Sequence, residues 1–199
     1  MKSMIKDAAI LFVITLISGL LLGVVYDVTK EPIAVQKGLR KNKACMEVFQ
    51  DAADFRALEL SVPETPGTGE KAAATINGVS EAVSEDGAVL GYVLDITSHE
   101  GYNGDIQFTM GIRTDGTVNG ISLLSIAETP GLGMKAEEVL KPQFAGKNVN
   151  LFMYTKTGSM SPDQIDAISG ATITTNAVVN GVNVGLEFYK TELGGGKNE

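Results

Sequence analysis

The chain has 199 residues, of which 44% are apolar and 23 are glycine, and its formal net charge is −8. This acidic balance argues against a nucleic-acid partner, and the apolar share is typical of a folded domain with many turns. A single cysteine, Cys45, and a single histidine, His99, exclude an internal disulfide and an iron–sulfur cluster and argue against a zinc or haem site. Any redox chemistry would therefore have to come from a bound organic cofactor.

Segment 8–26 predicts a membrane anchor that follows a short flank, residues 1–7. It contains no charged residue, and its 19 residues would rise about 28 Å as a helix, close to the thickness of the hydrocarbon layer. No A-x-A-like cleavage site follows, so we expect an uncleaved anchor rather than a signal peptide. Gly19 and Gly23 suit close packing against another membrane helix, although two glycines tolerated in lipid would give the same pattern.

The basic residues give conflicting information on orientation. Lys2 and Lys6 precede the anchor, whereas five basic residues follow it closely: Lys30, Lys37, Arg40, Lys41 and Lys43. A strict count places the C-terminal part in the cytoplasm, but the rule weakens for long domains, which translocate largely regardless of charge. Charge alone therefore leaves the orientation open.

A juxtamembrane helix is expected over residues 27–58. Pro32 either breaks the exit from the membrane or lies in the first turn of this helix. Cys45 falls within it and is expected to be a small buried residue rather than a catalytic thiol. Residues 60–70 then have the proline, glycine and threonine content of a loop.

The next part of the chain predicts strands. Residues 72–98 are expected to hold two strands, the second over 88–96. Residues 102–113 and 117–126 flank Thr114-Asp115-Gly116, and Asp-Gly between two runs of alternating polarity is a strong hairpin signal. We therefore expect an antiparallel sheet.

Helical patterns complete the domain, which is expected over residues 59–191. A short helix is predicted at 136–140, a short segment that leads into the following turn at 163–168, a closing helix at 177–190 and a flexible tail at 192–199. Gly181 and Gly185 each cost the closing helix about 1 kcal/mol relative to alanine, which close packing against the sheet or the anchor would explain. The order of elements predicts an α+β fold with helices packed on an antiparallel sheet.

The segment from Asp166 to Thr174 is the most informative part of the sequence. It contains a Gly170-Ala171 turn and then the hydroxyls of Thr172 and Thr174, just before a helix. A small-residue turn that opens a helix lets a ligand approach the backbone, and the free N–H groups there, which we expect at residues 174–177, suit a phosphate.

A second candidate loop runs from Glu128 to Met134. Its Pro130 fixes one backbone angle, while Gly131 and Gly133 permit positive φ. Such a turn can lay backbone N–H groups and Leu132 against a flat aromatic ring, with Glu128 and Thr129 at the ring's edge. An ordinary strand-to-helix turn would have the same composition.

Other residues carry weaker signals. Tyr102 could stack on a ring or be an ordinary core or surface tyrosine, and His99 is assigned no role. The segment Glu64–Gly69 is similar in sequence to the Glu128–Met134 loop but lacks the hydrophobic residue of that loop, and it is interpreted as a surface turn.

The pattern Asp166-x-x-Ser169-Gly170-Ala171-Thr172-x-Thr174 resembles the flavinylation motif of FMN-binding redox subunits. That family also carries Glu-Thr-Pro-Gly-hydrophobic-Gly upstream, as this chain does. Across residues 27–190 the chain resembles the FMN-binding G subunit of the Rnf electron-transport complex, and less closely the related C subunit of the sodium-pumping NADH:quinone reductase.

The resemblance implies that FMN is joined through a phosphoester to Thr174, with Thr172 and Thr175 the next candidates for attachment. It implies that Asp166 helps a Mg-dependent flavin transferase, which moves FMN from FAD, to recognise its substrate. The remaining cofactor-binding residues implied by the two motifs are Ser169, Gly170, Ala171, Thr172, Thr175, Glu128, Thr129, Gly131, Leu132 and Gly133.

The resemblance also implies a function. The chain would be an electron-carrying subunit of a membrane-bound, ion-translocating oxidoreductase of the ferredoxin/NAD type, incomplete as an enzyme without its other membrane subunits. Its C-terminal domain would face away from the cytoplasm. The alternatives are a membrane-anchored FMN-binding module or sensor without a pump role, and a stand-alone extracytoplasmic flavoprotein.

Overall fold

The computed structural model describes residues 2–59 and 72–194. The predicted loop 60–70, with its Glu64–Gly69 letters, and the last residues of the predicted tail lie outside this part. The chain divides into two compact units, Met1–Arg40 and Lys41–Glu199, each of which is described by itself.

The first unit is helical throughout its described length and forms most of α1 (Lys2–Val48). One stretch of this helix, Met4–Val48, is long and apolar enough to cross a membrane by length and composition. The two alternatives for Pro32, a break or the first turn of a new helix, are both wrong, because α1 continues through this residue. A proline removes a single backbone donor and crowds the preceding turn, so it weakens a helix locally without always ending it.

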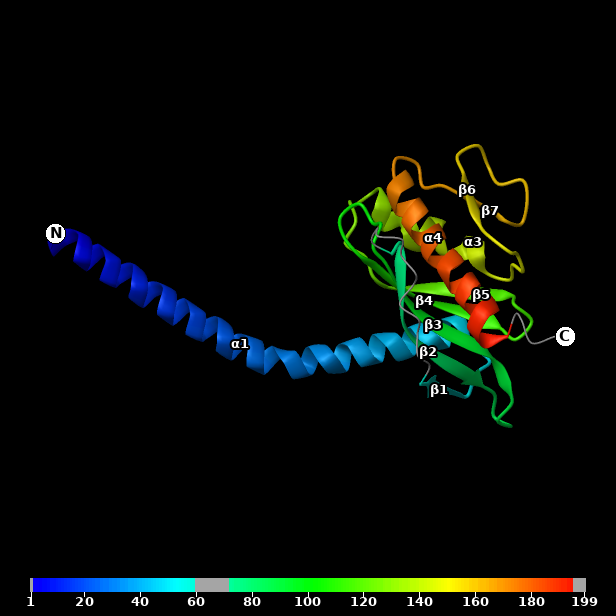
Figure 1. Cartoon of the computed structure of the whole chain (residues 1–199), viewed down its shortest axis with the longest axis horizontal. Coiled ribbons are helices and arrows are strands. Elements are labelled where there is room, and N and C mark those ends of the chain that lie inside the picture. Colours follow the sequence, from blue (N-terminus) through cyan, green and yellow to red (C-terminus); the bar gives the residue numbers. More distant parts are fainter. Residues whose placement is uncertain (1, 60–71, 195–199) are drawn as a thin grey trace. The chain divides into compact units, whose positions relative to one another are not determined.

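The second unit is built on a five-stranded antiparallel sheet in the order β1-β2-β3-β4-β5 (Figure 1). The predicted strand pair and hairpin are confirmed, and so is the α+β fold. The strands are β1 (Asp54–Leu58), β2 (Ala74–Val83), β3 (Val89–Ser98), β4 (Ile106–Arg113) and β5 (Val118–Ser125).

The juxtamembrane helix is shorter than predicted. It ends at Val48, and Asp54–Leu58 forms β1 where a helix was expected. Residues Asp54 to Leu58 pair with Val83 to Val79 of β2, and this pairing at the sheet edge outweighs the local helical pattern.

Helix α4 (Thr172–Phe188) covers one face of the sheet, and Figure 1 shows it lying across the strands. A Cβ atom built on Gly181 would lie 2.9 Å from Cζ of Phe108, and one on Gly185 would lie 2.7 Å from Sδ of Met110. The expected explanation of these glycines is therefore confirmed: they bring the helix close to the sheet.

Both ends of the closing helix differ from the prediction. It begins at Thr172 rather than Ala177, so the threonines of the motif are its first turn. It continues into a π-helical turn, η2 (Tyr189–Leu193), so the first two residues of the predicted tail are structured.

The opposite face of the sheet receives the end of α1. A Cβ atom built on Gly91 would lie 2.7 Å from Cζ of Phe49, and one on Gly111 would lie 2.9 Å from Cβ of Val48. Phe49 is fully buried, and Cys45 is buried beside it, as predicted for a structural thiol. Burial raises the pKa of the Cys45 thiol, which keeps it protonated and inert.

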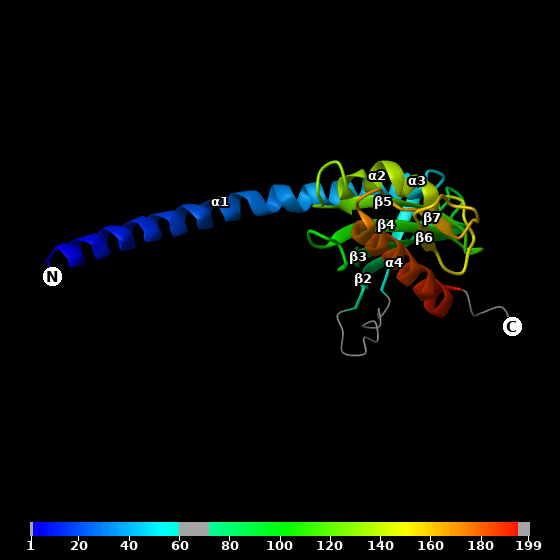
Figure 2. The same cartoon turned by 90° about the horizontal axis from the view of Figure 1, so that it is seen from above.

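A run of short elements connects the sheet to α4. It comprises η1 (Gly133–Lys135), α2 (Ala136–Val139), α3 (Lys141–Phe144), β6 (Met153–Thr155) and β7 (Gln164–Asp166). The short helix predicted at 136–140 is confirmed, whereas the parallel pair β6–β7 was not anticipated. Helix α3 lies against β5, and Figure 2 shows α2 and α3 beside the sheet and α4 across it.

Candidate functional site

The threonine motif forms a tight turn between β7 and α4. The Ala171 N–H donates to the Ile168 carbonyl at 3.0 Å, and Gly170 has φ of 76°, a left-handed conformation that favours glycine. Because the helix begins at Thr172, its first N–H groups are those of residues 172–174, which have no carbonyl partner within the helix. Of the expected range 174–177, Thr174 is among these residues and the rest is wrong: the Thr175 N–H already donates to the Ala171 carbonyl at 3.0 Å.

The three hydroxyls of the motif and that of Thr175, which follows it, have different surroundings. Thr175 is fully buried; its Oγ1 donates to the Ala171 carbonyl at 2.9 Å and accepts from the Ile168 N–H at 3.1 Å, so it is committed to the turn. Thr174 is 1% exposed, and none of the described residues hydrogen-bonds to its hydroxyl. Thr172 is half-buried and Ser169 is exposed.

The Glu128–Met134 loop, which lies upstream of the threonine motif, is held mainly by hydrogen bonds of its own backbone. The Thr129 carbonyl accepts from the N–H groups of Leu132 at 3.1 Å and Met134 at 3.3 Å. Gly131 has φ of 78°, and Glu128 is buried, whereas Leu132 is 40% exposed.

The two motifs, about forty residues apart in sequence, meet in the structure. A Cβ atom built on Gly133 would lie 2.6 Å from Oγ1 of Thr174, and one on Gly170 would lie 3.0 Å from Cδ2 of Leu132. Glycine at both positions therefore lets the two segments approach more closely than a side chain would permit, immediately beside the hydroxyl and the helix N-terminus. The N–H groups of residues 172–174 at this helix end suit a phosphate group.

Asp166 begins the motif and is held by a residue that the sequence did not single out. Gln143 of α3 accepts from the Asp166 N–H at 2.7 Å and donates to its carbonyl at 3.1 Å. Oδ2 of Asp166 accepts from Ser159 at 3.4 Å, while Oδ1 is the one buried side-chain oxygen or nitrogen without a partner among the described residues. Lys147 is near: burial lowers its pKa, and attraction to Asp163 and Asp166 opposes this shift.

Tyr102 and His99 lie in or beside the segment before β4. Tyr102 is 66% exposed, and its neighbour Asn103 donates its backbone N–H to Oε1 of Glu128 at 3.4 Å. His99 contacts Thr75 at 2.9 Å and Asp105 at 3.0 Å through its two ring nitrogens. Of these contacts, the one between Asn103 and Glu128 reaches the candidate site.

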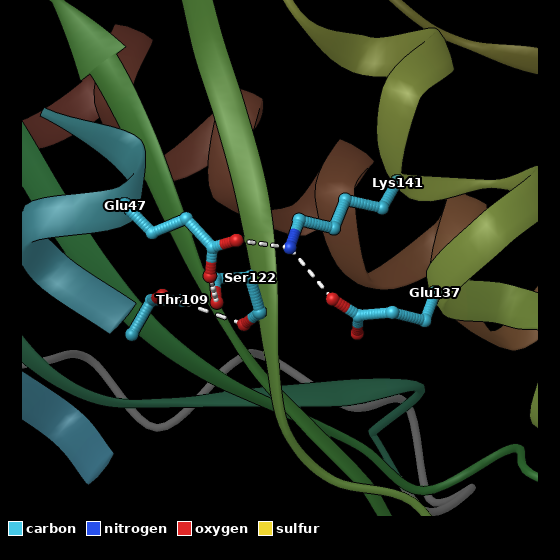
Figure 3. A network of polar contacts seen from close by, with 5 residues as sticks. All are labelled: Glu47, Thr109, Ser122, Glu137 and Lys141. Carbon is cyan, nitrogen blue, oxygen red and sulfur yellow. Dashed lines mark hydrogen bonds and ion pairs between the residues drawn. The ribbon is translucent and has the colours of Figure 1, made fainter. Parts of the chain in front are cut away.

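A polar network joins the end of α1 to the helices that follow the upstream loop (Figure 3). Lys141 contacts Glu47 and, at 2.6 Å, Glu137, while Ser122 donates to Glu47 at 2.5 Å. Partial burial opposes ionisation of Glu47, yet the hydrogen bonds from Lys141 and Ser122 leave the pKa of its carboxyl lowered. Burial likewise opposes the charge of Lys141, yet the two carboxylates leave its pKa raised. Local sequence patterns carry no signal for this network because its members are far apart in the chain.

Comparison with known proteins identifies the family. The sequence matches the FMN-binding domain family over residues 101–187 and the RnfG N-terminal region over residues 1–48. The G subunit of the Na(+)-translocating ferredoxin:NAD(+) oxidoreductase complex of Acetobacterium woodii is 34% identical over 193 residues, which cover 95% of this chain and 93% of that protein. The G subunit of the ion-translocating oxidoreductase complex of Methanosarcina acetivorans is 29% identical over 194 residues, covering 97% and 98%.

Among solved structures, the crystal structure of NqrC from Shewanella oneidensis has a TM-score of 0.49 and 21% sequence identity, covering 71% of this chain and 66% of that one. The sequence relatives are named as subunits of ion-translocating oxidoreductase complexes rather than as complete enzymes. Nearly the whole chain takes part in these matches, and it therefore belongs to the family of Rnf G subunits and contains an FMN-binding domain.

Proposed function

We propose that this chain carries electrons within a membrane-bound, ion-translocating oxidoreductase of the ferredoxin/NAD type, through FMN attached to Thr174 by a phosphoester. The observation that supports this most strongly is the approach of Gly133 to Oγ1 of Thr174, which joins the two motifs in one site. Bound FMN would supply chemistry that transfers one or two electrons.

The choice of Thr174 among the hydroxyls of the turn rests on their partners. Thr175 uses its hydroxyl both to donate and to accept within the turn, so a phosphoester there would break two buried hydrogen bonds. Among the described residues, none hydrogen-bonds to the hydroxyl of Thr174, which is the third residue of α4.

The surrounding residues would hold a phosphate on Thr174 electrostatically. The backbone N–H groups of residues 172–174 and the positive end of the α4 dipole attract an anion. Gly170 and Gly133 keep side chains away from this position, and the half-buried hydroxyl of Thr172 lies at the same helix end. Glu128, Thr129, Gly131 and Leu132 would border the flavin, and Ser169 and Ala171 would shape the turn.

The remaining roles follow from family membership. Other membrane subunits of the complex would deliver and accept electrons, and a flavin transferase would recognise Asp166 while it loads Thr174. Within α1, residues 8–26 would span the lipid, and the domain would lie on the extracytoplasmic side.

Intact mass and in-gel fluorescence under denaturing conditions test the attachment, on chain co-expressed with a flavin transferase. We expect a gain of one FMN less one water, mapped to the peptide that contains Thr174. Thr174→Ala should lose the adduct, whereas the matched Thr172→Ala variant should keep it. No adduct in a preparation where a control substrate is flavinylated would favour the binding-module alternative.

Orientation has a separate test. Ser159 is exposed, and Ser159→Cys adds a surface thiol to a chain whose own Cys45 is buried. If the domain is extracytoplasmic, a membrane-impermeant thiol reagent should label this variant in intact cells. Labelling only after lysis would instead indicate a cytoplasmic domain.

A further inference from the structure

The proposed attachment residue is closed off from any enzyme. Thr174 is 1% exposed, and the backbone of Gly133 lies directly against its hydroxyl. Attachment would form a bond from Oγ1 to the flavin-side phosphorus of FAD and break the phosphoanhydride bond. AMP would leave, and the hydroxyl proton would pass to water. None of these events can take place while the residue is only 1% exposed.

We propose that the segment Thr129–Met134 is a lid over Thr174 and must lift before FMN can be attached. This inference rests on the proposed function of Thr174 as the acceptor. It adds that the closed conformation described here is not the one that the flavin transferase modifies.

The lid is bounded by buried residues and is exposed between them. Glu128 is 5% exposed before it, and Ala136 is 1% exposed after it. Between these two residues, Pro130, Gly131 and Leu132 face solvent. A short segment with fixed ends and an exposed middle can rotate about its ends without disturbing the core.

Two backbone hydrogen bonds lie within the lid, where the N–H groups of Leu132 and Met134 donate to the Thr129 carbonyl. Two more join it to the residues that follow: the Lys135 N–H donates to Leu132 at 3.0 Å, and the Ala136 N–H donates to Gly133. The internal bonds can persist while the segment pivots about its Ala136 end. Its contacts with the threonine turn are van der Waals contacts: Leu132 lies against Gly170, and Gly133 lies against Thr174.

Leu132 therefore acts as a latch, and shortening its side chain should favour the open lid. A ligand or reagent that reacts only with the open form then reacts faster in proportion to the gain in open population. Because Leu132→Ala removes one half-exposed apolar contact, we expect the rate of reaction at position 174 to rise on the order of fivefold.

Thiol labelling of the flavin-free full chain in detergent measures this opening without any flavin chemistry. Thr174→Cys places a thiol beneath the lid, and Ser169→Cys places one at an exposed position of the same turn. We expect the thiol at position 174 to react much more slowly than the one at 169. Adding Leu132→Ala should accelerate only the thiol at position 174.

Two controls separate lid opening from general loosening. Leu151 is 54% exposed, comparable with Leu132 at 40%, so Leu151→Ala removes a similar side chain away from the lid and should change neither rate. The native Cys45 is 3% exposed in the sheet domain and should stay unreactive in the Leu132→Ala chain. Faster labelling of Cys45 in the Leu132→Ala chain would indicate global destabilisation and would refute the claim that Leu132 holds the lid closed.

Equal labelling at positions 174 and 169 would refute the lid, as would slow labelling at 174 that Leu132→Ala leaves unchanged. With limiting flavin transferase, Leu132→Ala should also speed FMN attachment by the factor seen in labelling. If labelling shows the lid but no adduct ever forms on Thr174, the lid stands and the attachment proposal fails.

Discussion

Gly133→Ala offers the most direct test of how the two motifs pack. The added Cβ would lie 2.6 Å from Oγ1 of Thr174 and 2.7 Å from Cβ of Glu128. Both neighbours are buried and cannot swing away, so we expect an overpacking cost of about 1–3 kcal/mol. Alanine restricts the unfolded chain and returns about 0.4–1 kcal/mol. The middle of each range leaves a net loss of about 1.3 kcal/mol, or about 3–5 °C in Tm for a domain of this size.

The assay is thermal unfolding of the flavin-free full chain in detergent, followed by circular dichroism. Gly78→Ala is the matched control, since the nearest atom to its added Cβ is Nζ of Lys41 at 3.9 Å, and its stability should rise by about 0.4–1 kcal/mol.

A double-mutant cycle locates the clash. In a Thr174→Ala background the shortest contact is absent, so the cost of Gly133→Ala should fall by about 0.5–1.5 kcal/mol. The reasoning is refuted if Gly133→Ala is as stable as Gly78→Ala, or if its cost is the same with and without the threonine hydroxyl.

Three further predictions concern the supports of the site. Thr175→Val should lower the free energy of unfolding by about 1–3 kcal/mol because it leaves the buried Ile168 N–H unpaired and removes one of the two donors to the Ala171 carbonyl, while Thr175→Ser should restore most of it; equal stability of the two variants would contradict this role. Gln143→Ala removes both hydrogen bonds to the Asp166 backbone and should cost about 1–3 kcal/mol in chemical unfolding, together with slower FMN attachment; an unchanged attachment rate would limit Gln143 to stability. The pKa of Glu47 is lowered in the folded state, so its contribution is present above its ordinary value near 4.5 and is lost as pH falls through the folded pKa. Glu47→Gln should therefore be less stable than the native chain at pH 7, by under about 1 kcal/mol because the pair with Lys141 is partly exposed. The difference should shrink as the pH falls through the folded pKa; a constant difference would show that ionisation of Glu47 is not the cause.

Local patterns in the sequence predicted much of this molecule. The uncharged run at 8–26 predicts a spanning helix by length alone, and Asp115-Gly116 between alternating runs predicts the β4–β5 hairpin. The threonine motif and the Glu128–Met134 loop were both recognised through their resemblance to the motifs of an FMN-binding family.

One prediction that failed depended on contacts between distant residues. Residues 54–58 carry a helical pattern, yet pairing with β2 makes them a strand. Pro32 signals a helix end, yet α1 continues. The start of α4 was placed five residues late, because the apolar period of a helix begins only after its first, polar turn.

The sequence by itself therefore determined the class of the site: a small-residue turn, a helix start and a set of hydroxyls, all encoded within nine consecutive residues. Only the tertiary structure decided which hydroxyl is committed to the turn, through the bonds of Thr175, and which is covered, through Gly133 on Thr174. The physical reason is that a hydroxyl's partners and its exposure depend on which segments pack beside it, and here the covering loop lies about forty residues upstream.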